Sequence, residues 1–218
     1  HVTGLLADLR WLGLDWDGEV MVQSQRMSAY AAAIAVLEAK GLLYRCICTR
    51  SDIAAAASAP QGPMGALYPG TCRHRAIGAD TTLPWSWRLD TAAALAMTGP
   101  LSWEDDAKGP TAADPALLGD AILARKDAGT SYHLSVVVDD AAQGVTHVTR
   151  GEDLFEATRI HVVLQRLLGL PVPAYHHHRL IRDTQGKRLA KRDDARALAK
   201  YRAEGATPAD IRRMVGLG

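Results

Sequence analysis

The fold is decided by the stretch Tyr132-His133-Leu134-Ser135-Val136-Val137-Val138-Asp139-Asp140, which is followed by Gly144-Val145-Thr146-His147-Val148-Thr149-Arg150-Gly151-Glu152-Asp153. Ser135 to Val138 is apolar and rich in β-branched residues, so we predict a buried strand there. Val145 to Thr149 predicts a second, short strand that ends beside Arg150. An arginine in this position can bind a carboxylate, because its planar guanidinium offers two parallel hydrogen bonds. For Arg150 taken alone, a surface ion pair is the simpler interpretation.

Amphipathic helices are expected both after and well before this stretch. From Glu156 to Leu168 apolar residues recur at helical spacing, and Gly169 marks the end of the helix. A second helix is expected from about Ser28 to Lys40, before a strand from Leu42 to Cys48. Strands interleaved with helices indicate α/β architecture. The other expected elements are a helix with Thr3 as N-cap and Gly13 as its stop, a strand over Trp85 to Leu89, an apolar run over Ala121 to Ala124, and tail helices over about Asp194 to Glu204 and Pro208 to Val215, the last with Thr207 as N-cap.

The composition is that of a globular protein. The chain has 218 residues, 48% of them hydrophobic, and this length and hydrophobic content are enough for one sizeable core. Its formal net charge is +1. No run of roughly 18 apolar residues occurs, and the first residues lack the basic and apolar regions of a signal peptide. We therefore expect a soluble, cytoplasmic protein with no membrane partner. The near-neutral charge leaves nucleic-acid binding open, since a local basic groove can coexist with it.

Three cysteines form a candidate metal site. Cys46 and Cys48 are two residues apart, so on an extended strand both sulfurs project from one face, and Cys72 follows a loop rich in glycine and proline. A small, odd number of cysteines does not suit a secreted disulfide framework, which favours reduced thiols. Zinc prefers four tetrahedral ligands, so Tyr68 or His74 could be the fourth, and general zinc chemistry favours His74. The alternative is that all three are ordinary buried thiols.

A basic loop, Gly186-Lys187-Arg188-Leu189-Ala190-Lys191-Arg192, follows the last expected strand. Its cations could contact a polyphosphate, because fixed lysine and arginine groups stabilise the negative charge that develops when ATP activates a carboxylate. A solvated basic loop before a helix is the alternative interpretation. The preceding run His176-His177-His178 does not predict a metal site, since three adjacent residues on a strand cannot all face one ion.

Together these motifs resemble the glutamyl and glutaminyl branch of the class I aminoacyl-tRNA synthetases. The resemblance covers nearly the whole chain and includes Leu12 to Gly18 and Gln23 to Arg26. The family's signature loop has the form Lys-Met-Ser-Lys-Ser or Lys-Leu-Ser-Lys-Arg. Here Lys191 matches the second lysine, whereas Arg188 and Ala190 replace the first lysine and the serine, so the charge is kept and a hydroxyl is lost.

The resemblance implies roles for individual residues. Lys191 would be the catalytic and ATP-binding lysine, Arg188 a second ATP-binding cation, and Asp153 a contact of the ATP ribose. Tyr132 and Arg150 match the tyrosine and arginine with which the family holds L-glutamate. ATP would enter with Mg²⁺ as a substrate.

The resemblance also implies a zinc site. The glutamyl-queuosine branch of the family binds zinc through Cys-x-Cys followed by Tyr-x-x-x-Cys, and the chain matches both motifs. One structural Zn²⁺ is therefore expected, with Tyr68 rather than His74 completing the site. The expected ligands are Cys46, Cys48, Tyr68 and Cys72.

The implied organisation has three parts. Residues 1–45 and 73–184 would form a class I Rossmann-like catalytic domain, residues 46–72 a zinc-binding insertion, and residues 185–218 the signature loop with short C-terminal helices. The His-Ile-Gly-His-like motif of the class and its first strand are not found in the chain. We therefore expect that the N-terminal nucleotide-binding segment is missing and that this polypeptide is an incomplete catalyst.

The implied function is ATP-dependent activation of L-glutamate without tRNA, followed by transfer to the queuosine of tRNA(Asp). Only 26 residues follow the basic loop, too few for the large anticodon-binding region of ordinary glutamyl-tRNA synthetases. One exposed tRNA loop could still reach the site, since RNA recognition favours splayed single-stranded loops. The alternatives are a catalytic fragment of a glutamyl-tRNA synthetase and a non-catalytic zinc-containing RNA-binding module, which would not need the amino-acid pocket.

Overall fold

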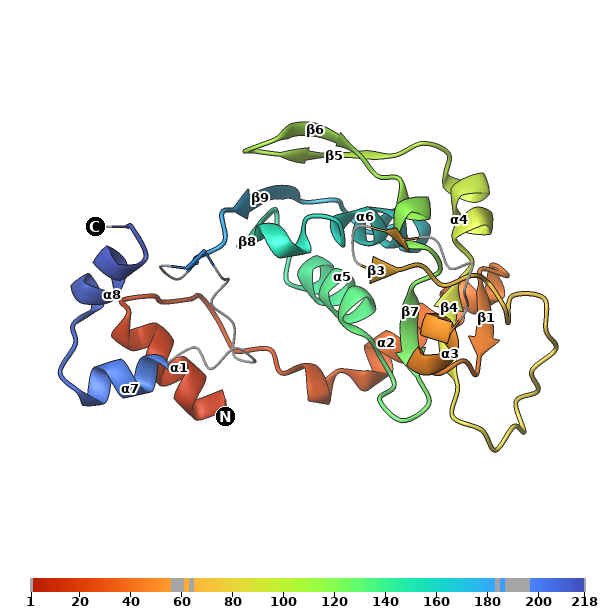
Figure 1. Ribbon diagram of the computed structural model, residues 1–218, viewed down its shortest axis with the longest axis horizontal. Coiled ribbons are helices and arrows are strands. Elements are labelled where there is room, and N and C mark those ends of the chain that lie inside the picture. Colours follow the sequence, from red (N-terminus) through yellow and green to blue (C-terminus); the bar gives the residue numbers. More distant parts are fainter. Residues whose placement is uncertain (1, 56–60, 63–64, 183–184, 187–196, 218) are drawn as a thin grey trace. The chain divides into compact units, whose positions relative to one another are not determined.

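The computed structural model describes residues 2–55, 61–62, 65–182, 185–186 and 197–217. The chain divides into two compact units, one formed by His1–Met21 with Arg179–Gly218 and the other by Val22–His178 (Figure 1). Within the described residues, no helix is long and apolar enough to cross a membrane.

The unit Val22–His178 contains most of the secondary structure. Its helical segments are η1 (Gln23–Gln25), α2 (Met27–Ala39), α3 (Arg50–Ala55), α4 (Thr91–Thr98), η2 (Pro115–Leu118), α5 (Tyr132–Ala142), η3 (Glu152–Leu154) and α6 (Thr158–Leu168). Its strands are β1 (Leu43–Cys46), β2 (Gln61–Gly62), β3 (Gly65–Ala66), β4 (Ser86–Leu89), β5 (Ser102–Asp105), β6 (Gly109–Ala112), β7 (Ile122–Arg125), β8 (His147–Gly151) and β9 (Ala174–His178). The other unit contains α1 (Val2–Trp11), α7 (Leu198–Ala203) and α8 (Pro208–Met214).

Two larger sheets organise the unit Val22–His178. One is antiparallel with strand order β1-β4-β7, and the other has the order β6-β5-β9-β8. In the second sheet β5 and β6 form an antiparallel hairpin, whereas β9 runs parallel to both β5 and β8. The parallel register pairs Arg150 of β8 with His177 of β9. Residues far apart in the sequence therefore meet on adjacent strands.

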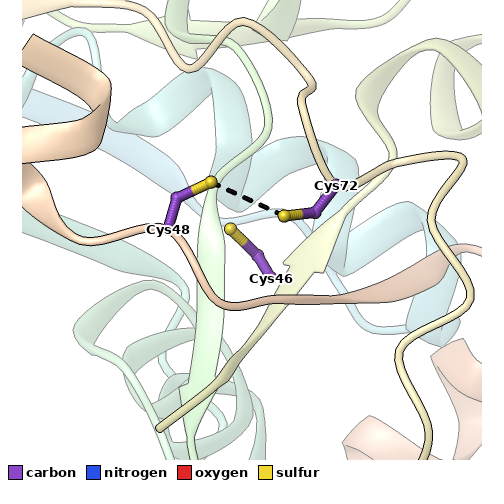
Figure 2. Close-up of side chains that lie close together, drawn as sticks. All are labelled: Cys46, Cys48 and Cys72. Atoms are coloured by element: carbon purple, nitrogen blue, oxygen red, sulfur yellow. Dashed lines mark hydrogen bonds between the residues drawn. The ribbon is translucent and has the colours of Figure 1, made fainter. Parts of the chain in front are cut away.

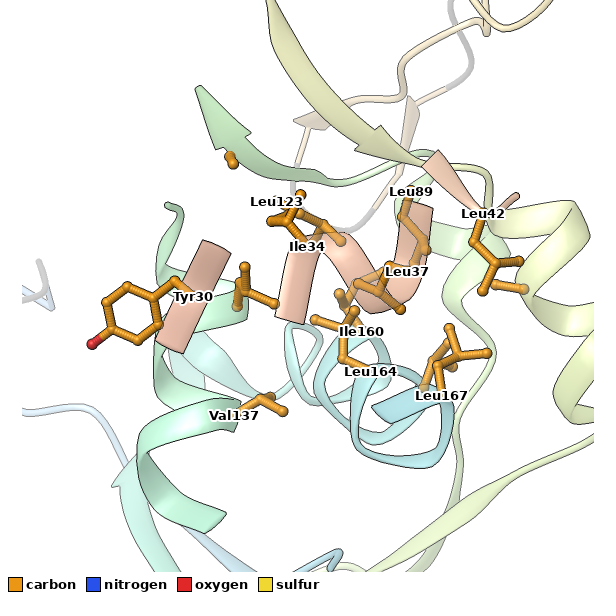
Figure 3. Close-up of a cluster of buried hydrophobic side chains, with 14 residues drawn as sticks. Tyr30, Ile34, Leu37, Leu42, Leu89, Leu123, Val137, Ile160, Leu164 and Leu167 are labelled. Carbon is orange, nitrogen blue, oxygen red and sulfur yellow. The ribbon is translucent and has the colours of Figure 1, made fainter. Parts of the chain in front are cut away.

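The main core lies where α2, α5 and α6 pack together with the antiparallel sheet (Figure 3). Each helix contributes apolar side chains at a spacing of three or four residues, which places them on one face. Fully burying one such side chain stabilises the fold by about 1.5–3 kcal/mol before entropy is counted. The labelled members are Tyr30, Ile34, Leu37, Leu42, Leu89, Leu123, Val137, Ile160, Leu164 and Leu167.

The strand predicted over Ser135 to Val138 is wrong, because this segment lies inside helix α5. Leu134 and Val137 are buried at a spacing of three, and Ser135 and Asp139 at a spacing of four, which is a helical pattern. Packing against α2 and α6 outweighs the strand preference of the valines, since β-branched residues disfavour a helix by only a fraction of a kcal/mol.

Most other predicted elements are confirmed within a few residues. The helix before Gly169 is α6, and Gly169 takes the left-handed conformation with φ 68° that ends a helix. Thr207 caps α8 by accepting a hydrogen bond from the Asp210 N–H, as predicted. Thr3 is not an N-cap, because α1 already includes it. The helix α4 and the hairpin β5–β6 were not predicted.

Candidate functional site

The three cysteines meet at the end of β1. Cys46 is the last residue of this strand, Cys48 follows two residues later, and Cys72 comes from the segment after β3 (Figure 2). Their sulfur atoms lie within 4.8 Å of one another, and the Cys48 and Cys72 sulfurs are 3.5 Å apart. Two thiolates on one tetrahedral Zn²⁺ would be about 3.8 Å apart, from a zinc–sulfur distance near 2.3 Å. The spacing of the sulfurs therefore fits a zinc ion.

Tyr68 brings a fourth donor atom to this cluster. Its hydroxyl accepts hydrogen bonds from the Cys46 thiol at 3.3 Å and from the backbone N–H of Cys72 at 2.8 Å, and lies 3.6 Å from the Cys48 sulfur. Tyr68 is buried, and the Arg88 guanidinium lies over its ring. His74 is exposed, and its ring is not part of the cluster of ligand atoms found among the described residues. The geometry thus favours Tyr68 over His74 as the fourth ligand.

The environment of the cluster favours ionisation of one thiol. Burial raises the pKa of Cys72, but interactions with the Tyr68 hydroxyl and the Ile47 N–H outweigh it and lower the pKa to about 7. Burial raises the pKa of Cys48 to about 11, and neighbouring thiols add to this effect. A bound zinc ion would instead lower the pKa of Cys48, because zinc binds thiolates.

A buried carboxylate anchors the segment that carries Cys72. The next residue, Arg73, donates to the Asp120 carboxylate through Nε at 3.1 Å and Nη2 at 2.6 Å. Asp120 also accepts from the Tyr44 hydroxyl at 2.5 Å and from the backbone N–H of Thr91 at 3.0 Å. Tyr44 of β1 and Arg73, next to Cys72, both bind the Asp120 carboxylate. These hydrogen bonds therefore help to hold the cysteine sulfurs close together.

A second cluster surrounds Arg150 on strand β8. Its Nε donates to His177 Nε2 at 3.1 Å, its Nη1 to His161 Nδ1 at 3.1 Å, and its Nη2 to the Thr158 hydroxyl at 2.5 Å. The hydroxyl of Tyr132, the first residue of α5, accepts a longer hydrogen bond of 3.4 Å from Nη1. The structure thus brings together the two predicted glutamate-binding residues, Tyr132 and Arg150.

Every hydrogen-bond partner of the Arg150 guanidinium described here is neutral. Among the described ranges, no carboxylate oxygen lies within 4.0 Å of it. A guanidinium stays charged in proteins, and a buried or half-buried charge normally acquires a partner of opposite sign. The site is therefore suited to an anionic ligand, and the planar fork of arginine suits a carboxylate.

Buried histidines complete the surroundings of Arg150. Burial lowers the pKa of His161 well below its ordinary value, and the Arg150 charge adds to this shift. Burial also lowers the pKa of His177, against the opposing effect of Asp105. His133, 3.1 Å from His161, has its pKa lowered for the same two reasons, burial and Arg150. Neutral imidazoles can accept hydrogen bonds from arginine, which imidazolium rings cannot.

A pocket adjoins both clusters. It has a volume of about 480 Å³, and Tyr132 and His133 line one part of it while Tyr68 and Arg88 line another. Tyr132 is exposed. The pocket therefore meets the Arg150 cluster through Tyr132 and His133.

The predicted ATP-binding residues are described only in part. Asp153 lies in η3, directly after β8, and its side chain is exposed. Arg188 and Lys191 lie outside the described residues.

Four residues of the Arg150 cluster were not predicted from the sequence: Asp105, Thr158, His161 and His177. His177 belongs to the histidine run, whose alternation on a strand could have singled it out, since it is buried and its neighbour His178 is exposed. Asp105 ends β5, a strand that the sequence did not predict. Only the sheet order brings it to His177.

Comparison with known proteins identifies the family of the chain. Residues 2–217 match the family described as tRNA synthetases class I (E and Q), catalytic domain. The chain is 59% identical over 227 residues to the glutamyl-Q tRNA(Asp) synthetase of Rhodobacter capsulatus, covering 98% of this chain and 81% of that protein. It is 45% identical over 216 residues to the protein of the same name from Nocardia farcinica, covering 94% of this chain and 65% of the relative.

Solved structures show the same fold. A glutamate tRNA ligase from Elizabethkingia meningosepticum superposes with a TM-score of 0.74 and 21% identity, over 100% of this chain and 50% of that chain. A glutamate-tRNA synthetase from Elizabethkingia anophelis gives a TM-score of 0.75 and also 21% identity, with 51% of its chain covered. The expected α/β class I fold and the family resemblance are thus confirmed. This chain belongs to the glutamate and glutamine branch of the class I tRNA synthetases and comprises residues of their catalytic domain.

Proposed function

We propose that this protein is an ATP-dependent ligase that activates L-glutamate without tRNA and transfers it to the queuosine of tRNA(Asp). Relatives that are 59% and 45% identical carry the name glutamyl-Q tRNA(Asp) synthetase. Since the chain spans 81% and 65% of these two relatives, the proposal concerns the complete protein. We place the reaction in the cytoplasm, where ATP and tRNA are available.

The observation that carries the proposal is the Arg150 cluster. Its guanidinium is held by neutral acceptors beside the Tyr132 hydroxyl, and it needs an anion to balance its charge. L-Glutamate supplies a side-chain carboxylate for Arg150, while its α-carboxylate remains free to attack the α-phosphorus of ATP. Pyrophosphate then leaves, and a hydroxyl of the acceptor nucleoside attacks the carbonyl carbon of the mixed anhydride, loses its proton and displaces AMP as the acyl–phosphate bond breaks.

The phosphate chemistry is assigned to the basic loop. Lys191 and Arg188 would neutralise charge on the α-phosphate and the leaving pyrophosphate, which grows in the transition state. Asp153 would accept hydrogen bonds from the ATP ribose hydroxyls. Mg²⁺ would enter with ATP. These roles follow the family resemblance residue by residue.

Zinc has a structural role in the proposal. Cys46, Cys48, Tyr68 and Cys72 would hold one ion, and the ion would tie the end of β1 to the segment after β3. The proposed insertion of residues 46–72 would thereby be fixed beside the pocket that Tyr68 lines. No reaction step passes through the metal.

The deciding experiment supplies the complete protein with ATP and glutamate, with and without tRNA, and measures ATP–pyrophosphate exchange. Exchange without tRNA, together with labelling of queuosine-containing tRNA(Asp) by radioactive glutamate, is expected. Strict dependence of exchange on tRNA, or labelling of tRNA(Glu) at its 3′ end, would instead establish a glutamyl-tRNA synthetase. Absence of any exchange alongside tight RNA binding would leave the non-catalytic RNA-binding module.

A further inference from the structure

Arg150 is connected to a buried carboxylate through one histidine. Asp105 Oδ2 lies 2.5 Å from Nδ1 of His177, and His177 Nε2 lies 3.1 Å from Nε of Arg150. The side chains of Asp105 and His177 are both 0% exposed. The three residues come from β5, β9 and β8, adjacent strands of one sheet. The connection therefore runs across rigid secondary structure.

The chemistry of the three groups defines one arrangement of protons. Arginine can only donate, so His177 Nε2 must accept from Arg150 Nε, and the Nδ1–H of His177 must then donate to Asp105. Asp105 thus selects the tautomer of His177, in the way that carboxylates orient histidines elsewhere in proteins. His161, with Nδ1 toward Arg150 and Nε2 toward His133, accepts from the other end of the guanidinium.

We propose that Asp105 and His177 are positioning residues that hold the Arg150 guanidinium in the orientation that binds the substrate carboxylate. His177 accepts the Nε hydrogen, and His161 and Thr158 each accept one hydrogen, from Nη1 and Nη2 respectively. The second hydrogen of Nη1, which faces the Tyr132 hydroxyl at 3.4 Å, and the second hydrogen of Nη2 then remain for the ligand. Neither residue need touch the substrate. The inference rests on the proposed function, because it assigns the carboxylate to glutamate.

The hydrogen bonds of Asp105 make a sharp test available. Its Oδ1 accepts from the backbone N–H groups of Ala107 and Lys108, each at 3.0 Å. In Asp105→Asn the amide oxygen must stay at this position to accept both bonds, so the amide NH₂ faces His177 Nδ1. His177 then carries its proton on Nε2 and presents a donor to the donor Nε of Arg150, which forces the two apart.

The same strands supply a matched control. Asp106 directly follows Asp105, and His176 directly precedes His177. The distance from His176 Nδ1 to Asp106 Oδ2 is 3.9 Å. The side chains of Asp106 and His176 are 59% and 44% exposed, respectively. Asp106→Asn and His176→Gln make the same chemical changes one residue away and leave the Arg150 contacts intact.

The experiment measures ATP–pyrophosphate exchange by the complete protein, with KM determined separately for glutamate and for ATP. Asp105→Asn should raise the glutamate KM by roughly tenfold to a hundredfold, as expected for a displaced binding group, with the ATP KM and kcat little changed. Asp106→Asn and His176→Gln should leave all three constants at wild-type values. His177→Gln, whose amide oxygen can accept from Arg150, should keep more glutamate affinity than His177→Leu.

A second measurement does not depend on activity. Nitrogen-15 NMR of labelled histidines should show His177 as the neutral Nδ1–H tautomer in the wild type and as the Nε2–H tautomer in Asp105→Asn. A folded Asp105→Asn variant with wild-type glutamate KM, or a wild-type His177 protonated on Nε2, overturns the positioning role. A wild type that gives no glutamate-dependent exchange overturns the proposed function instead, and the two failures are thereby distinguished.

Discussion

At the scale of single residues, Arg150 combines a permanent charge with neutral surroundings. Arg150→Ala should raise the glutamate KM strongly, because removing one member of a desolvated charge pair costs roughly 2–5 kcal/mol. Steady-state exchange kinetics of the complete enzyme, with ATP saturating, measure the effect. Loss of kcat with an unchanged glutamate KM would contradict this role.

Arg150→Lys provides the matched comparison, since it keeps the charge and removes the planar fork. Rescue should be poor, because the present contacts use Nε, Nη1 and Nη2 at once and an ammonium group cannot reproduce that geometry. Full rescue would show that charge alone suffices at this position.

Lys191→Ala should slow adenylate formation far more than it weakens glutamate binding. The lysine would meet charge that grows in the transition state, and removal of one such donor costs on the order of 2–4 kcal/mol. Rapid-quench measurement of the first turnover isolates this step. Arg192→Ala serves as a control for the charge of the loop, and an unchanged rate in Lys191→Ala would exclude the catalytic role.

At the scale of elements, Asp139 connects α5 to the start of α2 through hydrogen bonds. Its buried carboxylate accepts from Arg26 Nε at 2.7 Å, from the Tyr30 hydroxyl at 2.7 Å and from Gln23 Nε2 at 3.1 Å. Asp139→Ala should destabilise the protein by about 3 kcal/mol, because it leaves a charge and a buried hydroxyl without their acceptor. Gln23→Ala removes one neutral donor and should cost only about 1 kcal/mol. Equal urea midpoints for the two variants would refute this account.

The metal centre also belongs to the scale of elements. Removing zinc with a chelator should lower the melting temperature, because ligand binding free energy contributes to folding when the site does not exist in the unfolded chain. Elemental analysis should first find one zinc per chain. Cys72→Ser should melt at the same temperature with and without the chelator. A wild type that is insensitive to the chelator would show that the thiols are only buried.

At the scale of the whole molecule, the buried histidines predict how stability depends on pH. The pKa values of His161 and His177 are below the ordinary value of about 6.5 in the folded protein. As the pH falls below about 6.5, the unfolded chain therefore binds protons first, and stability decreases until the folded histidines also protonate. The pKa of Asp105 is also lowered, so its protonation decreases the stability of the fold further, but only at more acidic pH.

Urea unfolding at several pH values between about 5 and 8 tests this dependence. The charged and titratable groups facing the two histidines are Arg150, Asp105, Lys108 and His133. His161→Gln should reduce the slope of stability against pH below about 6.5, even where it lowers stability overall, since one titrating group is removed. A slope equal to that of the wild type would mean that His161 does not stay neutral on folding.

The sequence by itself determined those features that depend on short spacings. Helix α6 follows from its apolar periodicity and from Gly169, and the capping of α8 follows from Thr207. The cysteine pair pointed to a metal site because residues two apart share a face of an extended strand. The family resemblance singled out Tyr132 and Arg150, which the structure brings within 3.4 Å.

Tertiary structure alone decided what depends on long-range packing. Ser135 to Val138 prefers a strand locally, but contacts with α2 and α6 make it helical, since propensity differences are small beside the burial of side chains such as Leu134 and Val137. No sequence motif indicates the hydrogen-bonded series from Asp105 through His177 to Arg150. Its members are 72 and 27 residues apart, and only the parallel pairing of β5, β9 and β8 brings them together.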